Sequence, residues 1–391
     1  MRATTNFIRA WRDARRFFQL PERRRLIVFY SEGRLYGKYL QAVIWSLLQV
    51  EGATVSYLSS DPSDPMLELH DPRIDSFYIG MGSVRTYVFQ TLRAGVLVMT
   101  MPDLQTFHIK RSSVYPVHYV YIHHSMVSTH MIYRTGAFDH FDSILCGGPH
   151  HCDETRAWER LNKLPEKKLF KHGYAPVDTL MALAERSGRP PRGDRPLNVL
   201  LAPSWGPNGI LERGAEPLVS TLLRAGYRVI VRPHPRTLKI SGAIITALSR
   251  SFSTDTRFAL DIDTESLQPL LDADIMISDW SGVAMEFSFG LERPVLFMNV
   301  PRKVNNPRWS EIGMPPMEDI FRNEAGAVLN VQCTSDASAA IERLLNCSGM
   351  YAEHARALRA KYLFNPGNSG RSGAKHIAAL AAEAHQLSRQ Q

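Results

Sequence analysis

A short polar turn separates two strongly apolar segments between residues 273 and 299. The chain there runs from an apparent buried strand (ADIMI) through a turn (SDWSG) into a helix (VAMEFSFGLE). Ser281 and Gly282 would lie at the amino terminus of that helix, where unpaired backbone N–H groups and the helix dipole favour an anion. Their small side chains would let a phosphate group approach closely. The turn is therefore a candidate anion site.

Glu286 follows about one turn inside the same helix. It is poorly placed to bind phosphate, but its carboxylate could accept hydrogen bonds from sugar or ribose hydroxyls. A purely structural interpretation is also open, in which Ser281 caps the helix and Glu286 is its capping partner. The turn alone does not decide between a ligand site and a helix cap.

A second polar cluster, in VIVRPHPRT (229–237), follows another apolar strand. Arg232, His234 and Arg236 stand there between prolines. Because proline restricts the backbone, this strand end should be a rigid group of cationic donors. A lone histidine is usually structural, but two arginines and two prolines around it favour a functional role. Ser204 ends the strand predicted at 197–204 and is a further candidate, and Trp205, which follows it, could line the same site or simply pack.

Histidines are concentrated in the first half of the chain. Nine of the fourteen fall between His108 and His172. No HExxH motif and no Cys/His pairing accompanies them, so a metal site is not indicated. A histidine at the end of a strand, with a pKa near neutrality, suits a general base that deprotonates a hydroxyl group.

The elements that must position these residues alternate between strands and helices. Near-continuous apolar strands in such an alternation predict parallel sheets covered on both faces, and hence an α/β fold. In open α/β sheets, ligands bind at the carboxyl ends of the strands. The predicted strands lie within 25–30, 54–59, 75–80, 95–102, 117–125, 142–148 and 168–174, and then within 197–204, 227–235, 258–262, 273–279, 293–299 and 327–331.

A proline- and glycine-rich stretch, ERSGRPPRGDRP, interrupts this alternation and reads as a linker. Two doubly wound, Rossmann-like domains are therefore expected, with the site in the cleft where they face each other. The predicted divisions are a basic helix at 1–25, an N-terminal domain at 26–185, the linker at 186–196, a second domain at 197–370, and a C-terminal helix at 371–391 that could pack back on the N-terminal domain.

Bulk composition narrows the class of protein. With 391 residues, 44% apolar and 21% charged, the sequence is typical of a folded two-domain protein rather than a disordered one. Its net charge of +8 favours phosphate-bearing ligands or anionic membranes. Nucleic acid is not indicated, because zinc-finger spacing, an RRM signature and a lysine-rich arm are all missing. Four cysteines without a CxxC motif fit a reducing cytoplasm, and no apolar stretch reaches eighteen residues.

The first 25 residues carry eight arginines against two acidic residues, Asp13 and Glu22. At helical spacing Phe7, Trp11 and Phe18 share roughly one face. Such a helix could lie on an anionic membrane with its apolar face down. It could equally pack on its own domain with a solvated basic face. The first alternative predicts a cytoplasmic protein held peripherally on the inner face of the cytoplasmic membrane.

The second half of the sequence resembles a known family. An RPHP strand end, followed about 45 residues later by DADIMISDWSGVAMEF, resembles the CDP-glycerol glycerophosphotransferases, the teichoic-acid polymerase and primase group. The segment LFNPGNSGRSGAKHI (363–377) is similar to the closing segment of that family. The resemblance implies a GT-B fold, in which 26–185 would be the acceptor domain and 197–370 the nucleotide-donor domain. It also implies a CDP-linked donor and no required metal or cofactor. The donor-binding residues it implies are Arg232, His234, Arg236, Ser278, Asp279, Ser281, Gly282 and Glu286, beside Ser204 and Trp205.

The resemblance is weaker in the first half. The family has a Trp-His-Gly-Thr-Pro stretch whose histidine acts as the base, and here YVYIHHSMVSTHMIY places His124 with Ser125 at that point. The flanking Trp, Gly, Thr and Pro are absent. This implies His124 as a catalytic residue together with His234, and His123, Ser125 and His130 on the acceptor side.

These observations predict a metal-independent transferase. It would move glycerol phosphate, or a related polyol phosphate or sugar, from a CDP- or CMP-activated donor to a hydroxyl of a lipid-linked or cell-surface glycan, in capsule or teichoic-acid-like polymer synthesis. One alternative is a nucleotide-sugar glycosyltransferase or an enzyme like the UDP-sugar 2-epimerases, although few carboxylates follow the strands of the first half. Another is a GT-B binding protein without activity.

Overall fold

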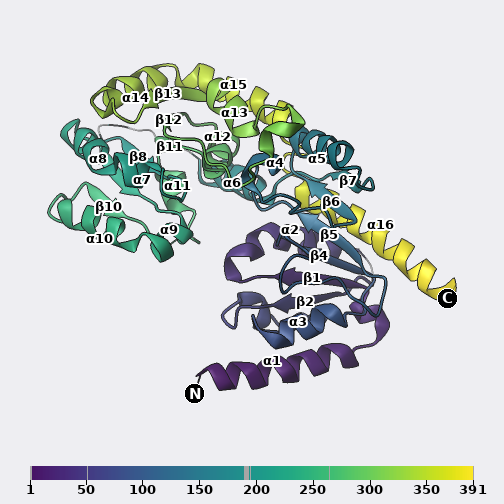
Figure 1. Cartoon of the computed structure of the whole chain (residues 1–391). Helices are drawn as coiled ribbons and strands as arrows, with labels where there is room; N and C mark the ends of the chain where they lie inside the picture. Colours follow the sequence, from purple (N-terminus) through teal and green to yellow (C-terminus); the bar gives the residue numbers. More distant parts are fainter. Residues whose placement is uncertain (1, 51, 189–192, 194, 264, 391) are drawn as a thin grey trace. The chain divides into compact units, whose positions relative to one another are not determined.

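The computed structural model describes residues 2–50, 52–188, 193, 195–263 and 265–390. The chain forms two compact units (Figure 1). Unit 1 comprises Met1–His124, Tyr133–Ala175 and Leu363–Gln391, and unit 2 comprises Ser125–Ile132 and Pro176–Tyr362. Residues 189–192 and 194 of the predicted linker lie outside the described part of the chain. The domain ranges given above, and the way in which the domains face each other, stay predictions.

The described residues of unit 1 form a seven-stranded parallel sheet with the order β3-β2-β1-β4-β5-β6-β7. Its order reverses between the adjacent strands β1 and β4, which is where sheets of this kind bind ligands. The strands are β1 (Ile27–Ser31), β2 (Val55–Ser59), β3 (Ile74–Tyr78), β4 (Val96–Met99), β5 (His118–Ile122), β6 (Ser143–Cys146) and β7 (Lys168–Lys171).

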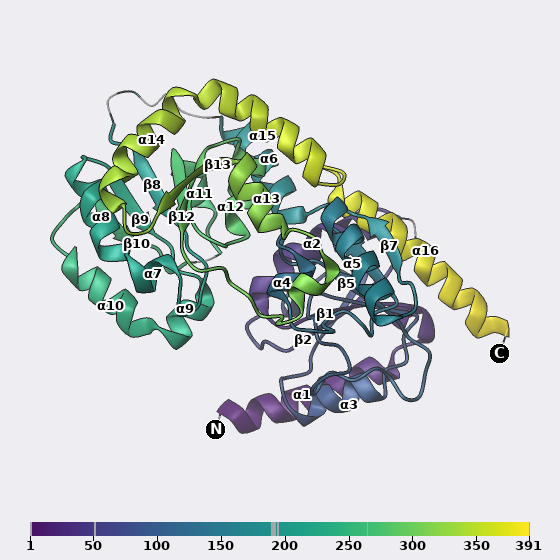
Figure 2. The ribbon, with the colours of Figure 1, turned by 45° about the horizontal axis from the view of Figure 1, so that its top comes forward.

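Helices cover both faces of this sheet because alternate residues of each strand point to opposite sides. On β1, Val28 and Tyr30 join one core cluster and Phe29 joins the other. The first cluster includes residues of α1 (Arg2–Gln19) and α3 (Ser83–Gln90), which Figure 2 shows side by side. The second includes residues of α2 (Gly37–Leu47) and α16 (Ser369–Gln390). Helix α5 (Pro149–Asn162) follows β6.

The described residues of unit 2 form a six-stranded parallel sheet with the order β10-β9-β8-β11-β12-β13, which reverses between β8 and β11. The strands are β8 (Asn198–Leu201), β9 (Arg228–Val231), β10 (Phe258–Leu260), β11 (Ile275–Ser278), β12 (Val295–Asn299) and β13 (Gly326–Asn330). The helices are α4 (Thr129–Ile132), α6 (Ala175–Ser187), whose first residue belongs to unit 1, α7 (Ile210–Arg213), α8 (Ala215–Arg224), α9 (Pro235–Ile240), α10 (Gly242–Ser251), α11 (Gln268–Asp272), α12 (Val283–Leu291), α13 (Met317–Glu324), α14 (Ala337–Asn346) and α15 (Ser348–Tyr362).

Each strand predicted from the sequence overlaps one of these observed strands, so the prediction of two parallel α/β sheets is confirmed. The central apolar runs become strands because both faces of the sheet are buried there, whereas the edge strands β7, β10 and β13 are only partly buried. Among the helices of the described residues, none combines the length and the apolar character needed to cross a bilayer.

Candidate functional site

The polar residues predicted to bind a donor gather at the carboxyl edge of the unit 2 sheet. They belong to the loops that follow β8, β9 and β11, which are neighbours around the point where the strand order reverses. Contacts between these loops decide which side chains hold the loops in place and which are available to a ligand.

Ser278 and Asp279 connect the β11 turn to the loop after β8. Both residues are buried, and the carboxylate of Asp279 accepts hydrogen bonds from the backbone N–H groups of Ser204 at 2.7 Å and Ile210 at 3.3 Å. The Ser278 hydroxyl donates to the carbonyl of Ala202 at 2.7 Å. Because both oxygens of Asp279 accept backbone hydrogen bonds, we expect these two residues to position the loop that carries Ser204.

Trp205, on that loop, lies against two cations. The guanidinium carbon of Arg236 is 3.9 Å from the centroid of the indole ring, and Nζ of Lys303 is 3.8 Å from it. Burial lowers the pKa of Lys303 to about 8, although the carboxylate of Asp279 opposes the shift. Cations this close to an aromatic ring gain from its quadrupole. The sequence analysis missed Lys303, since it lies in a loop after β12 that matches no motif.

Arg232 is buried beside the acidic residues after β10. Its Nε lies 3.5 Å from Oδ2 of Asp261, and its Nη2 donates to the carbonyl of Asp263 at 3.1 Å. The other terminal nitrogen, Nη1, has no hydrogen-bond partner among the described residues. Burial lowers the pKa of Arg232, and the charges of Asp261 and Glu286 oppose this shift. Arg232 and Glu286 therefore share one electrostatic environment, with one donor group left for a ligand.

His234 caps the amino terminus of α9. Its Nδ1 accepts the backbone N–H of Arg236 at 3.0 Å, so the neutral imidazole carries its proton on Nε2. The ring centroid lies 6.2 Å from that of Trp205. The cap fixes the ring orientation and makes Nε2 a hydrogen-bond donor.

Gly282 lies where α12 begins, close to a segment from another part of unit 2. A Cβ atom at Gly282 would lie 2.4 Å from Oγ of Ser125 and 3.3 Å from Val127. Further on, Ser128 donates its backbone N–H to Glu318 at 3.1 Å. The glycine is required here because residues 125–128 pass directly over the helix terminus.

Gly282→Ala is therefore expected to lower the free energy of unfolding by roughly 1–3 kcal/mol, as overpacking does. The clash is with the Ser125 hydroxyl, because Cβ of Ser125 lies 3.7 Å from the added Cβ atom, which is an ordinary contact distance. The same substitution in a Ser125→Ala background should therefore cost clearly less, as measured by chemical denaturation. Equal costs in both backgrounds would contradict this account of the contact.

The residues predicted for the acceptor side do not share one unit. Ser125 and His130 belong to unit 2, where the carbonyl of His130 accepts a hydrogen bond from Asn306 at 2.8 Å, whereas His123 and His124 belong to unit 1. His123 is buried, and its ring stacks on that of His151 with centroids 3.6 Å apart. Burial holds the pKa of His123 well below its usual value, so it is neutral.

His124 follows β5 at the carboxyl edge of unit 1. Its Nδ1 is 3.0 Å from the carbonyl oxygen of Thr100 and 3.0 Å from the Tyr121 hydroxyl. Since a carbonyl only accepts, Nδ1 carries the proton, and Nε2 has the lone pair of a base. Burial lowers the pKa of His124 to about 4, against the effect of the bond to Thr100. The ring is therefore neutral, and its orientation is fixed, around physiological pH.

Two carboxylates share this edge, which the sequence analysis did not single out. Glu32 follows β1 and Asp103 lies in the loop after the neighbouring strand β4. Burial raises the pKa of Glu32 to about 7, with Arg85 opposing the shift and Asp103 adding to it. Burial also raises the pKa of Asp103. An acid directly after a predicted strand was the available signal.

In the part of the chain that the structure describes, no three His, Cys, Asp or Glu residues are arranged to hold a metal ion. The candidate residues fall into two sets, one in each unit. In unit 2 the set predicted from the sequence follows β8, β9 and β11, and the structure adds a neighbour of Trp205: Ser204, Trp205, Arg232, His234, Arg236, Ser281, Gly282 and Glu286, with Lys303. In unit 1 the candidates follow β5, β1 and β4, and they are His124, Glu32 and Asp103.

Comparisons with known proteins agree with this architecture. No family model matches the sequence, and a search of curated proteins gives no match. Among solved structures, the wall teichoic acid polymerase TagF is similar, with 13% identity, a TM-score of 0.59 and coverage of 98% of this chain and 99% of that one. The UDP-GlcNAc 2-epimerase of Methanocaldococcus jannaschii has 15% identity, a TM-score of 0.54 and coverage of 91% and 99%. The UDP-GlcNAc 2-epimerase of Neisseria meningitidis has 13% identity, a TM-score of 0.55 and coverage of 91% of this chain and 99% of that one. The fold implied by the sequence resemblance is confirmed: the chain has the GT-B fold.

Proposed function

We propose that this chain is an enzyme that binds a nucleotide-linked donor in unit 2 and transfers the activated group to a hydroxyl acceptor. Glycerol phosphate from CDP-glycerol is the donor we expect, and a lipid-linked or cell-surface glycan is the acceptor. The observation that carries the proposal is the cationic edge of unit 2, where Arg236 and Lys303 lie over Trp205 with His234 beside them, and where Arg232 shares the electrostatic environment of Glu286 in α12.

This edge suits a diphosphate. Nη1 of Arg232 has no hydrogen-bond partner among the described residues, and Nε2 of His234 is a donor fixed by the cap on α9. Backbone N–H groups at the start of α12 add a partial positive charge. Preorganised donors of this kind stabilise the negative charge that develops on a leaving nucleotide. Glu286, whose charge acts on Arg232, would accept hydrogen bonds from ribose hydroxyls.

His124 is the base we assign. Its Nε2 would accept the proton of the acceptor hydroxyl as the acceptor oxygen bonds to the β-phosphorus of the donor. The bond from that phosphorus to the bridging oxygen breaks, and CMP leaves with the bonding electrons. The cations of unit 2 stabilise the charge on the departing phosphate. Similar folds include a structure of TagF soaked with CDPG and an epimerase with UDP-GlcNAc and UDP, which supports a nucleotide-linked donor here.

A second candidate function is a reaction of a UDP-sugar, as in the epimerases of similar fold. The observation in its favour is the acid pair after β1 and β4, because proton transfer at a sugar needs such groups. Glu32, with a pKa of about 7, could give or take a proton near neutral pH. Incubation with UDP-GlcNAc, followed by analysis of the products, separates this function from transfer to an added acceptor.

Calorimetry with CDP-glycerol, CMP and UDP, in EDTA, tests the donor proposal. We expect the cytidine compounds to bind without added metal. His234→Ala should weaken donor binding roughly 10- to 100-fold, because a hydrogen bond to a charged group contributes about 1.5–3 kcal/mol. Turnover should fall as well.

Arg250→Ala is the matched control, since Arg250 is an exposed cation on α10 away from these loops. It should leave donor affinity unchanged. If no nucleotide binds in EDTA and Mg²⁺ or Mn²⁺ restores binding, the metal-independent mechanism is wrong. If UDP alone binds, the cytidine donor is wrong.

A further inference from the structure

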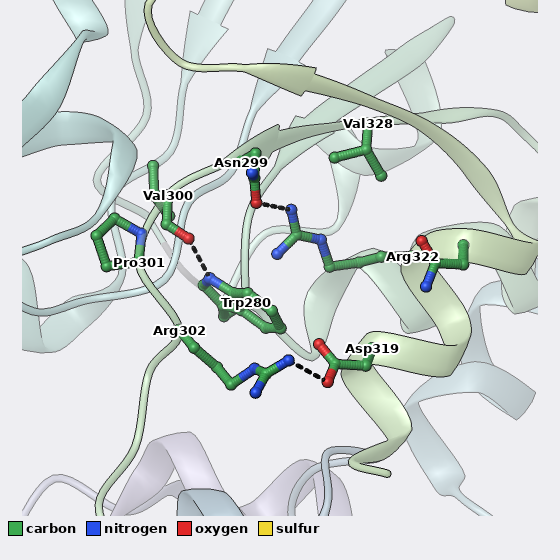
Figure 3. A pocket seen from close by; sticks show the side chains of 9 residues that line it. Trp280, Asn299, Val300, Pro301, Arg302, Asp319, Arg322 and Val328 are labelled. Carbon is green, nitrogen blue, oxygen red and sulfur yellow. Dashed lines mark hydrogen bonds and ion pairs between the residues drawn. The ribbon is translucent and has the colours of Figure 1, made fainter.

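Unit 2 contains a cavity of about 620 Å³ beside the end of β12, apart from the residues assigned to the donor. Figure 3 shows the side chains that line it, with the interactions of Trp280 with Val300, Arg322 with Asn299, and Arg302 with Asp319 marked. A volume of this size is typical of small-molecule sites. The lining residues are Trp280, Asn299, Val300, Pro301, Arg302, Asp319, Arg322, Asn323 and Val328.

Trp280, in the β11 turn between Asp279 and Ser281, belongs to the lining, but none of the residues assigned to the donor does. Trp280 points toward the end of β12, where its indole N–H donates to the carbonyl of Val300 at 3.0 Å. In the sheet, β11 separates β12 and β13 from β8 and β9. The loops after β8 and β9 carry Trp205 and His234, and neither residue lines the cavity.

Arg322, on α13, is the central polar group of this cavity. Its side chain lies over the Trp280 ring at 4.0 Å, and Nη2 donates to Oδ1 of Asn299 at 3.3 Å and to the carbonyl of Met298 at 3.4 Å. The residue is only 4% exposed, and Nη1 has no hydrogen-bond partner among the described residues. A buried donor left without a partner lowers stability, and the loss is larger when the donor is charged.

The charged side chains that line the cavity also carry an excess of positive charge. Its lining contains two arginines and one acid, and that acid, Asp319, is engaged by Arg302 at 2.6 Å. Burial lowers the pKa of Arg322, and the carboxylates of Asp279 and Asp319 only oppose this shift. An oxyanion in the cavity would supply both the missing acceptor and the missing negative charge.

We propose that this cavity is a second oxyanion site, which binds the phosphate group of a small ligand through Arg322. Val300, Pro301 and Val328 would contact the carbon part of the ligand. The phosphate could belong to a phosphorylated polyol or to a nucleotide. The site goes beyond the donor function, because it requires neither a donor nor a transfer reaction.

Titration calorimetry of the full chain at low ionic strength tests this, with sn-glycerol 3-phosphate and CMP as separate probes. We expect glycerol 3-phosphate to bind, and to bind still when CMP is saturating. Arg322→Gln should weaken this binding at least tenfold. Because Arg322 is buried, that variant can also affect folding, so Asn323→Asp is the main test. Asn323 is exposed, and the new carboxylate would repel the anion.

Asn346→Asp, on the exposed end of α14, is the matched control for the same charge change. It should leave the affinity for glycerol 3-phosphate unchanged, while Asn323→Asp lowers that affinity about tenfold. If the phosphate site prefers nucleotides, Asn323→Asp should instead weaken a second, His234-independent binding event of CMP. Equal affinities in wild type, Asn323→Asp and Asn346→Asp for both probes would overturn the proposal.

Competition separates this site from the donor site. If CMP displaces glycerol 3-phosphate completely and Asn323→Asp weakens the binding of both probes, the chain has one site for them, and the proposal of a second site is wrong. If glycerol 3-phosphate binds as expected and CMP does not bind, only the donor proposal fails. If CMP binds at one site only and glycerol 3-phosphate does not bind, only the cavity proposal fails. Binding of neither probe would overturn both.

Discussion

His124→Ala is expected to lower kcat by roughly 10² to 10⁴ and to leave donor affinity nearly unchanged. The reason is that a general base acts in the transition state, whereas donor binding depends on the cations of unit 2. In the structure the Nδ1–H of His124 is anchored on the carbonyl of Thr100, which leaves Nε2 as the basic atom. Single-turnover rates on the true acceptor, together with donor calorimetry, measure the two effects separately.

The pH profile is the control for this assignment. A base acts when unprotonated, so activity should rise with pH through its pKa. Because the pKa of His124 is about 4, its ionisation should leave kcat constant above about pH 5 and lower kcat only below that. An acid limb near pH 7 would point to Glu32 instead. Near wild-type kcat in His124→Ala would show that His124 is not the base.

Glu32→Gln is the variant to compare in that case. The other histidines considered from the sequence, His123 and His130, are both buried. His123 also stacks on His151, and its depressed pKa keeps it neutral. Glu32, at the edge of the same sheet as His124, is therefore a better second candidate than either histidine.

The strands were predictable because burial on both faces leaves a strong local signature. Segments such as Ile27–Ser31 and Ile275–Ser278 are buried throughout and are apolar up to a final serine, so their sequence alone indicates a central parallel strand. The motif residues of unit 2 lie where the sequence places them, after such strands or in the first turn of the helix that follows β11, while their role in binding stays a prediction. Helix α12 begins after the polar turn, as its glycine and serine indicated.

The roles of individual side chains were not predictable, because distant segments determine them. Asp279 is held by backbone groups of the loop after β8, and Lys303 contacts Trp205 from a loop after β12. Arg322 stands in a helix with no motif, and only the fold sets its side chain over Trp280. Such contacts join residues far apart in the sequence, where neither spacing nor composition carries a signal.

The amino-terminal helix shows why a sequence can leave two interpretations open. In α1, Ala10, Ala14 and Phe17 are buried in the core of unit 1, while Phe7 and Ile8 remain 50% and 63% exposed. Part of the apolar surface thus packs on the domain and part faces outward. Removing the whole segment would expose the core, so point substitutions on the exposed face test membrane contact better than a truncation at Leu26.

We propose that this exposed face binds anionic membranes. Ile8, Trp11, Arg12 and Arg15 are all exposed, and their spacing places them on one side of the helix. The Trp11 ring is 5.3 Å from that of Tyr87, which is exposed on α3 and extends the aromatic surface. An aromatic surface flanked by arginines suits the interface of an anionic bilayer.

Replacing both Arg12 and Arg15 with glutamine is expected to weaken binding to anionic vesicles roughly 30-fold, because each cation near such a surface contributes about 1 kcal/mol. Binding of the wild-type chain should also fall with added salt, which screens these charges. Co-sedimentation with vesicles of anionic and of neutral lipid measures both effects. The control is the double variant Arg224→Gln with Arg250→Gln, which removes the same amount of charge from two exposed arginines on α8 and α10 of unit 2. If the two double variants pellet equally, net charge rather than α1 drives the association, and if the wild-type chain does not pellet, the membrane proposal is wrong.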